Sequence, residues 1–125
     1  MANENIQVSV TPYYLKDESM PEKNRYVFSY TVSIHNDGEF DAQLLSRHWI
    51  ITNGETLKTQ EVRGDGVIGQ QPVIPPGESY QYTSGTVLES PVGTMQGSYR
   101  FSDEDGEFFD VSIPVFSLAA PLSVH

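Results

Sequence analysis

Apolar and polar residues alternate along several stretches of the chain, most regularly in residues 26–34. Five apolar side chains occupy every second position there: Tyr26, Phe28, Tyr30, Val32 and Ile34. From Phe28 onward, the residues between them are the small polar Ser29, Thr31 and Ser33. Successive side chains of a strand point to opposite faces, so a period of two predicts a strand with one buried face. We expect these five side chains to enter a core that also buries the single tryptophan, Trp49.

Six further segments have the alternation and length of strands: residues 6–14, 43–52, 56–63, 79–88, 95–102 and 107–116. The segment 43–52 is apolar on both sides, which indicates a central strand, with one face formed by Leu45, Trp49 and Ile51 and the other by Leu44 and Ile50. In the last segment, strict alternation predicts that one face carries Phe109, Val111, Ile113 and Val115.

Turn-forming residues separate these segments. Asn-Asp-Gly at 36–38, Asn-Gly at 53–54 and Asp-Gly at 105–106 tolerate the positive φ that tight hairpins require, and Pro-Pro-Gly at 75–77 suits a type II turn. Short strands joined by such turns predict an all-β fold, an immunoglobulin- or fibronectin-III-like β-sandwich of seven to eight antiparallel strands. At 125 residues, we expect one domain spanning 1–125, with its core at about 6–116 and a C-terminal tail at 117–125.

The net charge of the chain argues against two classes of binding partner. Seventeen acids and seven scattered bases give a net charge of −10, which argues against nucleic acid and against an anionic membrane surface. The chain has no cysteine, no secretory signal in residues 1–10 and no apolar run of the roughly eighteen residues that a membrane span needs. We therefore expect a cytoplasmic protein.

One motif has a known chemical meaning, the G-x-G-x-x-G run at 64–69. Prolines 72, 75 and 76 exclude the helix that follows this motif in a dinucleotide-binding fold. A glycine-rich loop can still bind an anion through its N–H groups, and a preceding arginine would assist. The candidate ligand loop is therefore Arg63, Gly64, Asp65, Gly66, Val67, Ile68 and Gly69. The other interpretation is an inter-strand loop whose glycines permit tight curvature while Val67 and Ile68 point inward.

Catalytic and metal motifs are absent from the sequence. There is no cysteine nucleophile, no G-x-S-x-G elbow and no zinc-type histidine spacing, and the histidines at 35, 48 and 125 lie far apart in the chain. Two acidic runs, 37–41 and 103–107, offer oxygen ligands without matching an EF-hand. We expect no enzyme activity, no cofactor and no specific metal site.

Several short motifs together resemble the ApaG family: SRHW at 46–49, EVRGDGVIG at 61–69, PPGE at 75–78, YTSG at 82–85, PVGTMQGSY at 91–99 and Phe116. The resemblance implies a fibronectin-III-like sandwich. It also implies a small standalone bacterial protein with an indirect link to cobalt and magnesium efflux. Similar domains in larger eukaryotic proteins, including an F-box protein and a polymerase-associated protein, look like interaction modules. The family supplies no catalytic residue.

Two leading hypotheses about function follow, and a third, metal-linked regulation through the acidic turns, ranks behind both. The first is a non-enzymatic module that binds another protein through a sheet face, an exposed strand edge or the glycine loop, as a monomer or weak homodimer. The alternative is a binder of a phosphorylated small molecule, such as pyrophosphate or a nucleotide, at residues 64–69.

Overall fold

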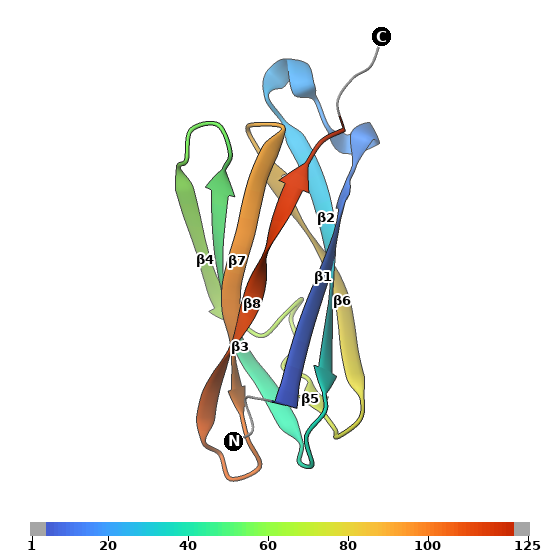
Figure 1. The fold of residues 1–125 in the computed structure, drawn as a ribbon, viewed down its shortest axis with the longest axis vertical. Coiled ribbons are helices and arrows are strands. Elements are labelled where there is room, and N and C mark those ends of the chain that lie inside the picture. Colours follow the sequence, from blue (N-terminus) through green and yellow to red (C-terminus); the bar gives the residue numbers. More distant parts are fainter. Residues whose placement is uncertain (1–4, 122–125) are drawn as a thin grey trace.

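Eight strands form two antiparallel sheets that pack face to face in the computed structural model, which describes residues 5–121 (Figure 1). The first sheet has the order β1-β2-β6, with β1 at Ile6–Tyr14, β2 at Tyr26–Asn36 and β6 at Ser79–Leu88. The second has the order β4-β3-β7-β8, with β4 at Thr59–Asp65, β3 at Ala42–Asn53, β7 at Val92–Ser102 and β8 at Phe108–Ala119. The two-residue strand β5, Val73–Ile74, pairs with the start of β3. The predicted fibronectin-III-like sandwich is confirmed.

The core lies between the sheets where the alternation places it. Phe28, Tyr30, Val32 and Ile34 are buried, and Tyr26, at the start of β2, is half-buried. Trp49 is only 3% exposed and meets the Tyr30 ring edge-on, with the ring centroids 5.3 Å apart. Residues 5–121 contain no α-helix, and the connection from β1 to β2 is made by two 3₁₀ turns, η2 (Lys16–Glu18) and η3 (Pro21–Lys23).

A β-bulge in β3 corrects the face assignment made for residues 43–52. Leu44 pairs with Phe101, but Ser46 pairs with the adjacent Arg100, so Leu45 is an extra residue on β3. The insertion of one residue reverses the inward and outward positions, because side chains alternate with a period of two. Leu44 therefore points into the core with Trp49, and Leu45 does not.

A second bulge corrects the prediction for the last strand. Met95 of β7 pairs with Phe116 while Gly97 pairs with Ile113, so β8 carries an extra residue at 114–115. Val115, predicted to share a face with Val111 and Ile113, is 59% exposed while those two are buried, and β8 continues to Ala119 with Leu118 buried. The core thus extends beyond 116 into the segment predicted as a tail, of which residues 122–125 lie outside the described part.

The two open sides of the sandwich differ. On one side, β1 and β8 pack against each other and close the gap between the sheets (Figure 1). Both strands contain a proline, Pro12 and Pro114, which has no N–H to offer to a further strand. On the other side, β4 and β6 are the sheet edges and make little contact with each other. The β4–β6 side is therefore the open side of the sandwich.

Candidate binding surfaces

The first two residues of the glycine loop, Gly64 and Asp65, belong to the end of β4. Gly64 is a strand residue paired with Arg47 and does not have a positive φ. Gly66 and Gly69 do, at 62° and 78°, and Ile68 between them has a φ of 43°. The curvature expected of the loop is therefore confirmed at Gly66 but not at Gly64.

The N–H groups of the loop point at carbonyl groups of the protein. The N–H of Gly66 donates a hydrogen bond of 2.7 Å to the carbonyl oxygen of Leu45. Leu45 is the extra residue of the β3 bulge. Val67 and Gln70 exchange backbone hydrogen bonds of 2.8 and 2.9 Å. Gly66 and Val67 therefore already have protein acceptors for their N–H groups, which an anion nest at 64–69 would have to use.

Close contacts explain two of the glycines in the motif. A Cβ on Gly64 would come within 2.8 Å of the Arg47 guanidinium carbon, which lies over the Gly64 backbone. A Cβ on Gly66 would come within 2.2 Å of the carbonyl oxygen of Gln70. Of the two apolar side chains expected to point inward, Val67 is fully buried, whereas Ile68 is 57% exposed. Close packing thus accounts for Gly64 and Gly66, where a Cβ would not fit.

The cation that contacts this loop is Arg47, which the sequence analysis missed. Its Nη1 donates to the carbonyl oxygens of Asp65 and Gly66, over 3.0 and 2.9 Å. Arg63 instead lies on the outer face of the sheet, exposed, with its Nη2 3.4 Å from Glu61 Oε1. The sequence did contain a signal, since Arg47 is two residues before Trp49 and strand alternation places both on the core side.

The outer face of the larger sheet carries a small ion-pair network. His48 Nε2 donates to Glu61 Oε1 over 2.7 Å, and this bond, with the nearby Arg63, holds the pKa of Glu61 below its ordinary value. Arg100 binds Asp110 across β7 and β8, at 3.0 Å. These pairs are solvent-exposed, so they contribute little to stability.

A groove runs between β4 and β6 on the open side of the sandwich. It has a volume of about 360 Å³, and its floor consists of core side chains from both sheets. The lining residues are Tyr30, Arg47, Trp49, Ile51, Gln60, Val62, Ser84, Gly85, Thr86, Val87 and Met95. Arg47 is the only charged residue among them, and the single tryptophan lies on the floor.

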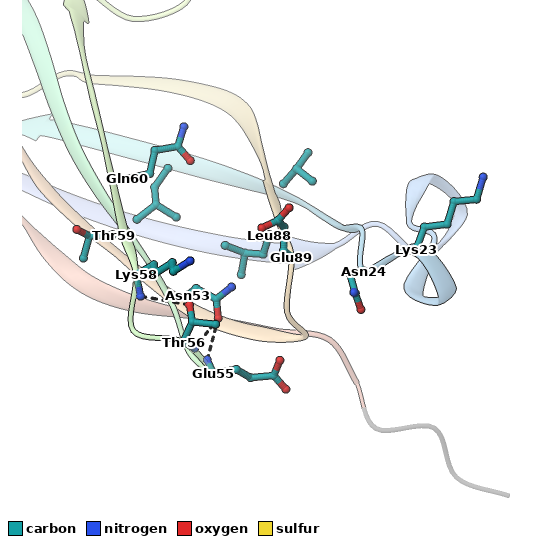
Figure 2. Close-up of a pocket in the computed structure, with 12 residues that line it drawn as sticks. Lys23, Asn24, Asn53, Glu55, Thr56, Lys58, Thr59, Gln60, Leu88 and Glu89 are labelled. Atoms are coloured by element: carbon teal, nitrogen blue, oxygen red, sulfur yellow. Dashed lines mark hydrogen bonds between the residues drawn. The ribbon is translucent and has the colours of Figure 1, made fainter.

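The groove widens toward the β3–β4 hairpin into a pocket of about 860 Å³ (Figure 2). Ile51, Gln60 and Val87 line both parts, so the two are continuous. Figure 2 shows the hairpin residues, Glu55 to Gln60, on one side, and Leu88, Glu89 and the 3₁₀ turn with Lys23 on the other. The hairpin is fixed by Asn53, whose side-chain oxygen accepts the N–H groups of Glu55 and Thr56.

The backbone of β6 beside this groove is open on one side. Asn36 donates to the Glu78 carbonyl and accepts from the Gly77 N–H, which makes it a hydrogen-bonded position. Pairs alternate along an antiparallel ladder, so the pairs of Ser79, Gln81, Thr83, Gly85 and Val87 are non-hydrogen-bonded. Side chains lie closer together at non-hydrogen-bonded pairs than at hydrogen-bonded ones. In agreement with this, the hydroxyl groups of Thr31 and Thr83 form a hydrogen bond of 2.8 Å. Every second residue of β6 therefore directs its N–H and C=O away from β2.

Two acidic runs meet at the opposite end of the molecule. Glu39 and Asp41 of one run line a pocket of about 250 Å³ together with residues 103–105 of the other, next to the exposed ring of Phe40. Within residues 5–121, however, no three His, Asp or Glu side chains come together in a way that would hold a metal ion.

Three buried tyrosines lie deeper in the sandwich. Burial raises the pKa of Tyr30, Tyr82 and Tyr99, so each phenol stays neutral near neutral pH. The hydroxyls of Tyr82 on β6 and Tyr99 on β7 form a hydrogen bond that links the two sheets. Because neither phenol is ionised or next to a base, this cluster has a structural role in the core.

The strand order defines this protein as a small antiparallel β-sandwich of the fibronectin type III kind, with one bulge in the central strand β3 and one in the edge strand β8. A family model described as the ApaG domain matches residues 16–103. The chain therefore belongs to the ApaG family. It is 57% identical to Protein ApaG of Pseudomonas paraeruginosa and 53% identical to Protein ApaG of Aromatoleum aromaticum, in each case over 96% of this chain and 94% of the relative.

Solved structures agree with this assignment. The crystal structure of an ApaA protein from Bordetella pertussis is 52% identical, with a TM-score of 0.90 over 94% of this chain and 95% of the other. A second solved structure, a structural-genomics target, is 47% identical with a TM-score of 0.91 over 100% and 97%. In the part of the chain that the structure describes, no helix has the length and apolarity to span a membrane.

Proposed function

We propose that this protein is a non-enzymatic interaction module that binds an extended segment of a partner protein along β6. The segment would add a strand to the β1-β2-β6 sheet and place alternate side chains into the groove between β4 and β6. The observation that carries the proposal is the edge of β6 itself. It is ten residues long, contains no charged residue and no proline, and lies beside the groove that has Tyr30, Trp49 and Met95 among its lining residues.

The other edges lack this combination. Natural sheets protect exposed edges with charges, prolines, bulges or a covering element. β4 carries Glu61, Arg63 and Asp65, and β1 and β8 carry prolines and cover each other. The backbone groups of residues 79–88 form hydrogen bonds with β2 and with no other described part of the backbone. β6 is thus the edge that this sequence leaves available.

A phosphate-binding role for residues 64–69 has no comparable support, because the N–H groups of Gly66 and Val67 already bond to carbonyl groups. A link to cobalt or magnesium homeostasis would be indirect, through the partner protein.

The proposal is tested by selecting displayed random peptides against the protein and titrating the best binder into isotope-labelled protein. We expect amide shifts at β6 and along the groove, together with a change in the fluorescence of Trp49. Val87→Pro removes an N–H that points away from β2 and should weaken binding by about tenfold or more, since it deletes a hydrogen bond and adds a ring at the edge.

The matched control is Val87→Thr, which keeps the N–H and the β-branched shape and should bind as the parent does. Shifts confined to the outer face of the larger sheet, or a selected peptide that is insensitive to Val87→Pro, would refute strand addition at β6. A selection that yields no binder would contradict the interaction module itself.

A further inference from the structure

Arg47 is a fixed cation without a carboxylate partner. Its Nη1 is held by the carbonyl oxygens of Asp65 and Gly66, and its guanidinium lies flat against Gly64. Among residues 5–121, the arginines that form ion pairs are Arg63 and Arg100, not Arg47. Carbonyl contacts orient the guanidinium but do not neutralise it, so its Nε and Nη2 remain suited to an incoming anion.

The surroundings of Arg47 inside the sandwich favour the interaction of its guanidinium with an added anion. Tyr30, Tyr82 and Tyr99 are close enough for Arg47 to influence their pKa values, and burial keeps all three neutral. Arg47 lines the groove together with Ser84 and Gly85 of β6, the strand whose edge is open. A cation in a partly dry, uncharged environment interacts more strongly with an added carboxylate than one in bulk water does.

The charge along the groove is opposite to that of the whole chain. Its lining contains three cations, Lys23, Arg47 and Lys58, and two carboxylates, Glu55 and Glu89. The groove therefore has a net charge of +1 within a protein of net charge −10. At physiological salt, charges within about 8 Å decide what a site attracts, so an acidic segment fits this groove although the molecule as a whole is acidic.

We infer that Arg47 is the specificity determinant of the groove and binds the side-chain carboxylate of a Glu or Asp in the partner's extended segment. This inference rests on strand addition at β6 and specifies which segments are accepted. Pairing between two copies of this chain is disfavoured, because β6 contains no carboxylate to offer and two chains of charge −10 repel each other. The carboxylate is placed within the segment, since β6 continues past Ser84 to Ser79 and the added strand can continue with it.

A peptide exchange that leaves the protein unchanged tests this inference. Binders from the random selection should contain an Asp or Glu at one fixed position, and replacing it with Asn or Gln should weaken binding to the parent protein about tenfold. Trp49 fluorescence supplies the readout, because this single tryptophan lies on the groove floor. C-terminal amidation of the peptide should change nothing.

A double-mutant cycle identifies Arg47 as the partner. In Arg47→Gln, the acidic and the neutral peptide should bind equally, whereas in the control Arg100→Gln, an arginine outside the groove, the preference for the acidic peptide should remain close to that of the parent. If Arg47→Gln does not fold, Arg47→Lys with the same peptide pair takes its place. Lysine keeps the charge without the bidentate fork, so the preference should shrink without vanishing.

The outcomes separate the two proposals. Peptides that bind along β6 with no acidic position, or with an acidic position that is indifferent to Arg47→Gln, would overturn the inference and leave strand addition intact. Loss of binding on C-terminal amidation alone would also overturn it, in favour of capture of a chain terminus. Absence of any peptide binder would refute both proposals.

Discussion

The two open sides of this sandwich differ in how their sheet edges, with their unpaired backbone N–H and C=O groups, are protected from a further strand. On the β1–β8 side, the sheet edges pack against each other, and Pro12 and Pro114 remove donors that another strand would use. On the β4–β6 side, the edges stay apart and the floor between them consists of core residues such as Trp49 and Met95. One side is built to exclude a further strand, and the other has the features that would accept one.

The edge strands differ in the charges, prolines and bulges that would prevent a further strand from pairing with them. Charges protect β4, and a bulge and a proline protect β8, whereas β6 has neither charge nor proline over ten residues. An unprotected edge is an aggregation risk unless it has a binding role, so its presence next to a groove favours function over accident.

The largest effect is expected from Trp49→Ala. Trp49 packs against Tyr30, Tyr99 and Phe116 although it also lines the groove, so its loss should destabilise the fold by about 3–5 kcal/mol. Phe116→Ala, on the closed side and only half-buried, should cost less, about 2 kcal/mol. Urea unfolding followed by circular dichroism measures both. A cost below 1 kcal/mol for Trp49→Ala would mean that the open side is not continuous with the core.

The second prediction concerns the loop that closes the inner end of the open side. Gly66→Ala should cost roughly 2–3 kcal/mol, because it combines a positive φ with a clash against the Gln70 carbonyl. Gly69→Ala is the control, since it has the same sign of φ but no atom within 4 Å of the added Cβ, and should cost about 1 kcal/mol. Equal costs for the two variants would show that the loop does not pack as described.

The third prediction uses the hydrogen bond that ties the sheets together beneath the open side. Tyr99→Phe removes the partner of the Tyr82 hydroxyl and should cost about 1–2 kcal/mol. In the parent, burial raises the pKa of both phenols above the ordinary 10.0, so the unfolded chain loses these protons first as pH rises. Stability is therefore fully present below about pH 10 and falls above it. Denaturant titrations from pH 8 to higher pH should show a shallower decline in Tyr99→Phe.

The smallest effect is expected from Arg63→Ala. Arg63 is an exposed residue on the outer face, paired only with Glu61, so the urea midpoint should not change. Calorimetric titration of pyrophosphate into the parent and into Arg63→Ala should give no heat at millimolar ligand. Heat from the parent that disappears in Arg63→Ala would restore the anion-binding hypothesis for residues 64–69.

The sequence by itself determined the strands, the sandwich and most of the core. Alternation in residues 26–34 placed Phe28, Tyr30, Val32 and Ile34 correctly, and the turn residues separated the strands, because both signals depend on neighbouring residues alone. The sequence also contains the glycine motif at 64–69, but the same residues suit both an anion nest and a packed loop, so the motif alone does not distinguish the two.

The tertiary structure decided which side each strand presents beyond a bulge and what lies opposite each edge. The bulges at Leu45 and at 114–115 reverse the burial of Leu44 and Val115, and a bulge follows from pairing with a distant strand. The same long-range pairing directs the Leu45 carbonyl to Gly66, lays Arg47 over Gly64 and leaves β6 without a neighbour. Residues that meet only through the pairing of remote strands leave no local period in the sequence, and for that physical reason the groove emerged only from the fold.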